Sequence, residues 1–205
     1  MPMKSFPFPE QPYDYSLFIR GVKKSGEIDN RTFDKADDKD IANFEKTLGF
    51  ELPTEYVDFL RNCNGGVIDP NRASRSLSID TKAYLSGKPF PEPSVGTHFF
   101  FTLDKKSLSD GEDASTMVYL FHLPSAQNIF HDLEYEGLTK GLENEKLLYF
   151  INGHSYYFLL GCEGQFKNKV LVLNTNLEPN SPLENVAVVA ESFDAFMQSL
   201  YYEAK

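Results

Sequence analysis

Residues 38–66 read DKDIANFEKTLGFELPTEYVDFLRNCNGG, and this stretch decides the fold. Its apolar residues recur at helical spacing on either side of Leu52-Pro53, which predicts two helices separated by an extended crossover. Asp37 or Asp38 is suited to cap the first helix, and Gly49 to end it. The second helix starts at Pro53-Thr54 and stops at Asn64-Gly65-Gly66, where we expect positive φ. The predicted buried faces hold Ile41, Phe44 and Leu48 in the first helix, and Tyr56, Val57, Leu60 and Cys63 in the second.

Runs of β-branched and aromatic residues outside this stretch predict strands. The runs cover 97–103, 116–123, 147–151, 156–160, 170–173 and 186–190, with turn signals at Asn152-Gly153 and Glu163-Gly164. Residues 67–96 are rich in proline and predict loop with one short strand at 77–79. Two more helices are predicted, one from Pro124-Ser125 and one that closes the chain, with Phe193, Phe196, Met197, Leu200 and Tyr201 on one face. The pattern is typical of an α+β fold with a mainly antiparallel sheet flanked by about four helices.

The length of 205 residues fits one domain. Residues 1–36 carry several prolines and little periodicity, so we expect an extended N-terminal arm before a domain over 37–205. The N-terminus lacks the apolar stretch of a signal peptide, and no run is long enough to span a bilayer. A cytoplasmic protein with no membrane association is therefore expected. Cys63 and Cys162 are too few for a disulfide framework and are predicted to be reduced, buried thiols.

The net charge of −10 argues against direct binding of nucleic acid, because phosphate recognition needs clustered Lys and Arg. It also disfavours anionic membrane surfaces and is compatible with a basic partner. The middle of the chain is the most acidic part. Its candidate partner-binding residues are Asp110, Glu112, Asp113, Asp132, Glu134 and Glu136. The last three fall at the end of a predicted helix, where carboxylates oppose the macrodipole, so a basic partner would relieve them. A solvated acidic face is the alternative, as is an interface anchored by Tyr and Phe from 84–101.

No catalytic, metal or cofactor site is predicted. Gly153-His154-Ser155 resembles half of a nucleophile elbow, but Tyr157 stands where the second glycine is needed, so a hairpin turn is the better interpretation. Cys63 lies on a helix face assigned to the core. His122, His131 and Asp132 lack the short spacing of metal ligands. No glycine-rich phosphate-binding motif is present.

The motifs resemble the opening signature of the SUKH superfamily, which includes bacterial immunity proteins and a fungal regulator of cell-wall synthesis. The matching residues are Ile41-Ala-Asn-Phe-Glu45, Leu48-Gly49, Leu52-Pro53-Thr-Glu-Tyr56, Phe59-Leu60 and Asn64-Gly65-Gly66, with Ala190-Glu-Ser-Phe193 near the end. The resemblance covers about residues 38–204. The chain departs from it in its longer N-terminal arm and in lacking a Gly-Asp pairing between 147 and 161.

The resemblance implies a non-catalytic protein-binding domain that neutralises a cognate toxin domain, often a basic nuclease, in bacterial competition. An acidic inhibitor would associate rapidly with such a toxin. A regulatory or scaffold protein of the same fold, without a toxin partner, is the alternative. A hydrolase would require activity that depends on His131 or Ser155. The sequence indicates no oligomeric state.

Overall fold

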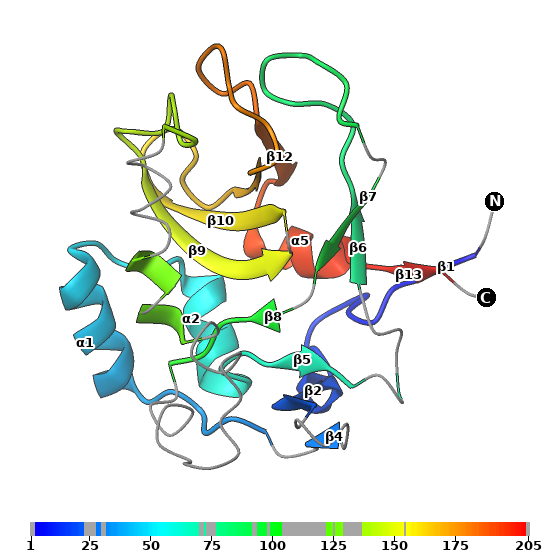
Figure 1. The fold of residues 1–205 in the computed structure, drawn as a ribbon. Coiled ribbons are helices and arrows are strands. Elements are labelled where there is room, and N and C mark those ends of the chain that lie inside the picture. Colours follow the sequence, from blue (N-terminus) through cyan, green and yellow to red (C-terminus); the bar gives the residue numbers. More distant parts are fainter. Residues whose placement is uncertain are drawn as a thin grey trace.

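The computed structural model describes residues 3–22, 28–29, 32–69, 72, 77–91, 94–97, 99–103, 122–124, 126–128, 137–153 and 155–203. A curved sheet forms the centre, helices cover it, and long loops extend from one end of it (Figure 1). Across these residues, every helix is too short or too polar to cross a membrane.

The two helices predicted from the opening stretch are present. Helix α1 spans Asp38–Leu48 and helix α2 spans Thr54–Asn62. The Asp37 side chain caps α1 by accepting a hydrogen bond of 2.8 Å from an amide of its first turn. Gly49 ends α1 with φ of 79°, and Pro53 occupies the N-cap position of α2. Local capping chemistry therefore fixes both boundaries, as predicted.

The turn that ends α2 joins the helices to the sheet. Asn64 is 1% exposed and has φ of 58°. Its side-chain amide donates to the carbonyl of Asp34 at 2.6 Å, and its Oδ1 accepts from the amide of Leu103 at 2.9 Å. A Cβ on Gly65, which has φ of 86°, would lie 2.4 Å from the carbonyl oxygen of Phe101. The positive φ is confirmed, and close backbone approach is a second reason for glycine.

The central sheet is antiparallel, with the strand order β12-β11-β10-β9-β8. Its strands are β8 (Phe99–Phe100), β9 (Lys146–Gly153), β10 (Tyr156–Glu163), β11 (Val170–Asn174) and β12 (Val186–Ala190). Helix α5 (Phe193–Ser199) follows β12 and contacts it. The last four strands were predicted, three of them shorter than they are. The α+β class with a mainly antiparallel sheet is confirmed.

Three predicted boundaries are wrong. The region 67–96 holds β5 (Val67–Ile68), β6 (Leu77–Asp80) and β7 (Ser94–Thr97), so it contains more strand than expected. The strand predicted for 97–103 is divided, because β7 ends at Thr97 to pair with β6 while β8 pairs with β9. The closing helix stops at Ser199. Leu200 is extended, Tyr201 bridges to Ser78 in β6, and Tyr202–Glu203 form β13. Pairing with distant strands overrides local periodicity there.

Two predicted elements lie largely outside the described residues. Of the strand predicted for 116–123, residues 116–121 are among those not described, and His122 forms a bridge with Thr102. Of the helix predicted from Pro124, residues 123–124 and 126–128 are helical.

The N-terminal arm lies along the domain in short strands. They are β1 (Lys4–Ser5), β2 (Phe18–Ile19), β3 (Gly21–Val22) and β4 (Ile28–Asp29), with a 3-10 turn at Tyr15–Leu17. β1 pairs with β13 and β2 pairs with β5, so both ends of the arm's first half are fastened. Phe8 is 0% exposed and stacks on Phe18 with ring centroids 5.4 Å apart. The boundary at 36/37 stays a prediction.

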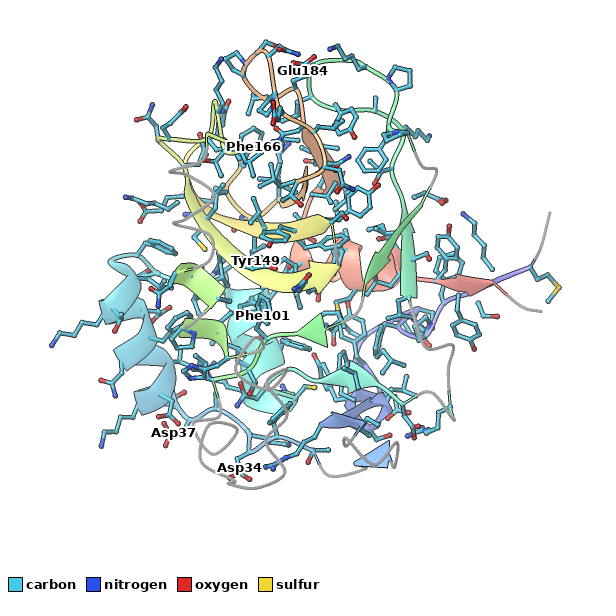
Figure 2. All side chains as sticks on the ribbon, viewed as in Figure 1. Asp34, Asp37, Phe101, Tyr149, Phe166 and Glu184 are labelled. Atoms are coloured by element: carbon cyan, nitrogen blue, oxygen red, sulfur yellow. The ribbon has the colours of Figure 1, made fainter. Side chains whose placement is uncertain are left out.

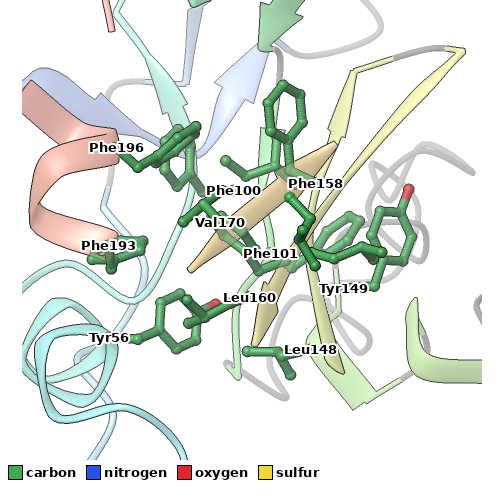
Figure 3. Close-up of a cluster of buried hydrophobic side chains, with 14 of the residues drawn as sticks. Tyr56, Phe100, Phe101, Leu148, Tyr149, Phe158, Leu160, Val170, Phe193 and Phe196 are labelled. Atoms are coloured by element: carbon green, nitrogen blue, oxygen red, sulfur yellow. The ribbon is translucent and has the colours of Figure 1, made fainter. Parts of the chain in front are cut away.

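Aromatic rings fill the space between the helices and the sheet (Figure 3). Phe193 and Phe196 of α5 both contact Phe150 of β9, with centroids 5.8 and 5.7 Å apart. Tyr56 of α2 meets the same Phe150 ring edge-on at 5.6 Å. Tilted and edge-to-face pairs of this kind add to the stabilisation from apolar burial.

The side chain of Tyr56 is 0% exposed, and no described residue is a hydrogen-bond partner of its hydroxyl. Desolvation raises the pKa of this phenol well above its usual value, so the hydroxyl is neutral. A buried polar group without a partner costs about 1–3 kcal/mol. We expect Tyr56→Phe to raise the free energy of unfolding by about 1 kcal/mol, seen as a higher urea midpoint at unchanged m-value.

Tyr149→Phe is the matched control for this substitution. Tyr149 is equally deep in the core, but its ring stacks on that of Tyr157 with centroids 4.5 Å apart, and its hydroxyl interacts with the Tyr157 side chain. Loss of the Tyr149 hydroxyl is expected to lower the free energy of unfolding by about 1 kcal/mol. A lower midpoint for Tyr56→Phe would mean that the Tyr56 hydroxyl has a stabilising partner.

Candidate interaction surface

The six acidic residues predicted to contact a partner all lie outside the described residues. Asp110, Glu112 and Asp113 fall within 104–121, and Asp132, Glu134 and Glu136 fall within 129–136. Their role stays a prediction. The described chain resumes at Gly137, directly after Glu136, and leads into the loops at one end of the sheet (Figure 1).

Three loops gather at that end, and we call them the loop platform: residues 81–89, 137–145 and 175–185. They connect different pairs of elements, yet they lie together above β12 and the ends of β10 and β11 (Figure 1). Figure 2 shows Glu184 among them, at the opposite end of the molecule from Asp34 and Asp37. Loops carried by a rigid sheet are where proteins most often place binding residues.

Buried asparagines help to hold the three loops in place. Asn174, at the end of β11, donates from its side chain to the hydroxyl of Tyr84 at 2.8 Å. Asn185, just before β12, donates from its side chain to the carbonyl of Leu138 at 2.9 Å. The amide of Leu85 donates to the carbonyl of Val186 at 2.6 Å. The first loop is thereby hydrogen-bonded to the ends of β11 and β12, and the third loop to the second.

Glu184 organises the platform electrostatically. It is only 8% exposed, and its Oε2 accepts hydrogen bonds from the amides of Asn180 and Ser181 at 2.7 and 3.1 Å. Its other carboxylate oxygen forms an ion pair with Lys88 of the first loop. A buried carboxylate with several donors holds its surroundings firmly, because losing any partner leaves charge desolvated. The platform is therefore pre-organised.

This pre-organised platform exposes apolar side chains. Leu85 is 39% exposed and Leu177 is 37% exposed, in the first and third loops. In the second loop, Gly137, Thr139, Lys140 and Glu143 line a hollow of about 250 Å³. The pKa of the Glu143 carboxyl lies below its usual value because backbone amides donate to it, and the amide of Gly141 contributes most. Exposed apolar residues on a rigid surface with nearby fixed charge are suited to protein recognition.

Four of the five aromatic residues considered as alternative anchors are buried, and the surroundings of the Phe99 side chain are outside the description. Tyr84, Phe90, Phe100 and Phe101 are each at most 7% exposed, so in this structure they belong to the core. Tyr84 instead supports the platform through Asn174.

The described residues among those considered for catalysis are buried or lie in a turn. Cys63 and Cys162 are buried free thiols, as predicted, and burial raises the pKa of Cys162 to about 12. Ser155 lies in the β9–β10 turn, where its carbonyl accepts the amide of Thr175. Within the described ranges, no three His, Cys, Asp or Glu side chains are grouped as metal ligands. His131 and His154 lie outside those ranges.

The sequence interpretation missed the platform. Its contacts join residues that are far apart in the chain, and neither exposed leucine belongs to a periodic pattern. One available signal was the placement of Asn174 and Asn185 at the facing ends of two buried apolar strands. Polar side chains at such positions are typically hydrogen-bonded to nearby loops.

A family model described as the SMI1 / KNR4 family (SUKH-1) matches residues 35–199. The match spans both opening helices, the central sheet, the platform and α5, and it begins after most of the N-terminal arm. No curated protein matches the chain at the significance required.

Proposed function

Because the chain belongs to the SMI1 / KNR4 family (SUKH-1), we propose that it is a non-catalytic immunity protein that neutralises a basic toxin domain. The observation that carries this proposal is the loop platform, a pre-organised surface with exposed Leu85 and Leu177. A rigid surface loses little entropy on association, so a modest number of contacts supports tight binding. No reaction by this chain is part of the proposal.

Charge supplies the second element of the proposed mechanism. The net charge of −10 attracts a basic toxin and speeds the encounter. Carboxylates of Asp132, Glu134 and Glu136, just before the platform, would then pair with Lys or Arg that the toxin uses for nucleic-acid phosphates. Asp110, Glu112 and Asp113 would extend the acidic surface. The toxin would be blocked by occupation of its substrate groove.

Co-expression with the C-terminal domain encoded by the neighbouring gene, which the proposal expects to be a toxin, tests the proposal. We expect the two proteins to co-purify and the immunity protein to restore growth. A regulatory or scaffold protein of this fold would co-purify with a cellular protein and leave the toxin active. Detection of a hydrolytic activity that is lost on mutating His131 or Ser155 would reject a non-catalytic role.

Neutralising three of the predicted acids should weaken this association. We expect Asp132→Asn, Glu134→Gln and Glu136→Gln together to lower the association rate about tenfold at low salt, since charge complementarity acts mainly on the encounter. The wild-type rate should fall steeply as salt rises, and the variant's less steeply. Stopped-flow or surface binding kinetics over a range of ionic strength measures both.

The matched control changes net charge equally at sites far from the acidic segment in sequence. Glu10, Glu51 and Glu163 are exposed, and their replacement by Gln also removes three negative charges. This control variant should change the association rate about twofold at most, because it alters only the overall electrostatic field of the protein. Equal effects of the two triple variants, or rates indifferent to salt, would remove the acidic segment from the mechanism.

A further inference from the structure

The central sheet ends in a strand that has one neighbour. Among the strands that the structure describes, β12 is the last of the order β12-β11-β10-β9-β8, and it pairs with β11 alone. Its sequence, Val-Ala-Val-Val-Ala over 186–190, contains no charge and no proline. Edge strands usually carry a charged residue or a proline, because an open apolar edge is a template for pairing with another chain.

The hydrogen-bond pattern shows which backbone groups of β12 point outward. The amide of Asn174 donates to the carbonyl of Asn185 at 2.9 Å, which makes these two residues a hydrogen-bonded pair. Alternation along an antiparallel ladder then turns Ala187 toward β11 and turns Val186 and Val188 away from it. The bond from the amide of Leu85 to the outward carbonyl of Val186 agrees with this assignment.

The edge is covered at Val186 and open at Val188. Among the described residues, none forms a hydrogen bond with the outward N–H or C=O of Val188. The Val188 and Val189 side chains are half-buried. The ladder shifts register between Leu171 and Val170, so Val189 is an extra residue in β12. The open position therefore combines a free backbone pair with apolar side chains.

We propose that the outer edge of β12 at Val188 binds an extended segment of a protein partner by strand addition. The interaction rests on the proposed binding function and would place the segment next to Leu85 of the loop platform. Backbone hydrogen bonds to Val188 supply affinity, and contacts with Val189 and Leu85 select apolar side chains. A segment that is basic at its flank suits the net charge of −10; Glu191 beyond the strand is exposed but already forms an ion pair of 2.7 Å with Lys169.

A second copy of this chain fits the edge less well. Antiparallel self-pairing about a twofold axis at Val188 would set Val186 of each copy opposite Ala190 of the other. The carbonyl of Val186 is already bonded to Leu85, so the symmetric ladder is blocked one pair from its centre. A partner segment that runs along Val188 toward Ala190 avoids this obstruction.

Amide exchange in the free protein is the first test. At concentrations where sedimentation shows a monomer, the Val188 amide should exchange at least roughly tenfold faster than that of Ala187, which is paired with β11. Comparable protection of both amides would show that the edge is covered within the molecule and would overturn the proposal. So would a dimer whose formation protects Val188.

A model segment tests strand addition directly. The probe is an N-acetylated, C-amidated peptide of alternating Val and Lys, about eight residues long. At saturation it should slow Val188 amide exchange at least roughly tenfold. The same peptide with alternate N-methylated residues, which lacks the donors, should have no effect. Equal protection by both peptides, or none by the first, would refute strand addition.

Two variants connect the edge with the partner. Val188→Pro removes the outward N–H together with the half-buried valine side chain, at a position where a sheet edge tolerates proline. Val188→Thr keeps both the N–H and the branched shape. Val188→Pro should weaken toxin binding at least tenfold and Val188→Thr less than threefold. If Val188→Pro is folded and neutralises the toxin normally, strand addition is wrong while the immunity function stands. If the peptide protects Val188 but no toxin binds, the proposed function fails instead. The peptide comparison decides the matter should Val188→Pro misfold.

Discussion

Gly161→Ala is expected to lower the free energy of unfolding by about 3 kcal/mol or more. A Cβ at this position would lie 1.8 Å from the carbonyl oxygen of Phe166, which is backbone and cannot rotate away. The close approach is fixed on both sides. The amide of Gly161 donates to Lys169 at 2.9 Å, and its carbonyl accepts from Asn168 at 2.7 Å. Adding one methyl group therefore forces the β10–β11 connection away from the strand.

Urea unfolding followed by far-UV circular dichroism measures this effect. Gly49→Ala is the control, because a Cβ there meets nothing within 4 Å and only the φ of 79° opposes it. That strain should cost about 1 kcal/mol. If Gly161→Ala were no more destabilising than Gly49→Ala, the turn after β10 would have to be loose enough to move aside.

The helical part of the fold was predictable because its signals are local. Asp37, Gly49 and Pro53 each act within one turn of the chain, so the boundaries of α1 and α2 follow from the residues beside them. The later strands were predictable for a related reason. Buried apolar runs bounded by turns leave few alternatives, and the run at 186–190 corresponds to β12 without change.

The errors fall where distant pairing decides the structure. Tyr201 continues the periodic pattern of α5, yet its backbone bonds to Ser78. The strand predicted for 156–160 stops before Gly161, whereas β10 continues through this glycine to Glu163, and the reason for glycine there is a turn that follows it in the chain. A glycine inside a strand pattern does signal close backbone approach, but the sequence does not identify the approaching residue.

The candidate site divides in the same way. Net charge and the acidic segment can be read from the sequence, and the basic partner that they indicate stays a prediction. The loop platform depends on Asn174, Asn185 and Glu184 bonding across loops, which no local pattern encodes. The open edge at Val188 depends on strand order, because the same five residues would be fully paired in the middle of a sheet.

Changes in the N-terminal arm are expected to cause the second large loss of stability. The family match starts after most of the arm, but the folded core includes it. The match starts at residue 35, but a Cβ on Gly66 would lie 2.6 Å from the carbonyl oxygen of Ile19. The second glycine of the Asn-Gly-Gly turn is thus required by contact with the arm. Phe18 beside it is 1% exposed, with its ring 5.1 Å from that of Phe100 and 5.6 Å from that of Phe59. The arm is therefore part of the core.

We expect Phe18→Ala to destabilise the protein by about 3–5 kcal/mol, the usual cost of removing a fully buried phenylalanine. A chain that starts at residue 35 should lose cooperative unfolding altogether, since it leaves the Phe59 and Phe100 rings uncovered. Phe6→Ala is the control within the arm, because Phe6 is 45% exposed and its loss should cost about 0.5 kcal/mol. Urea midpoints and near-UV circular dichroism measure all three. A cooperative transition with an unchanged midpoint in the shortened chain would show that the arm covers the domain without stabilising it, and the folded unit would then begin at the family boundary.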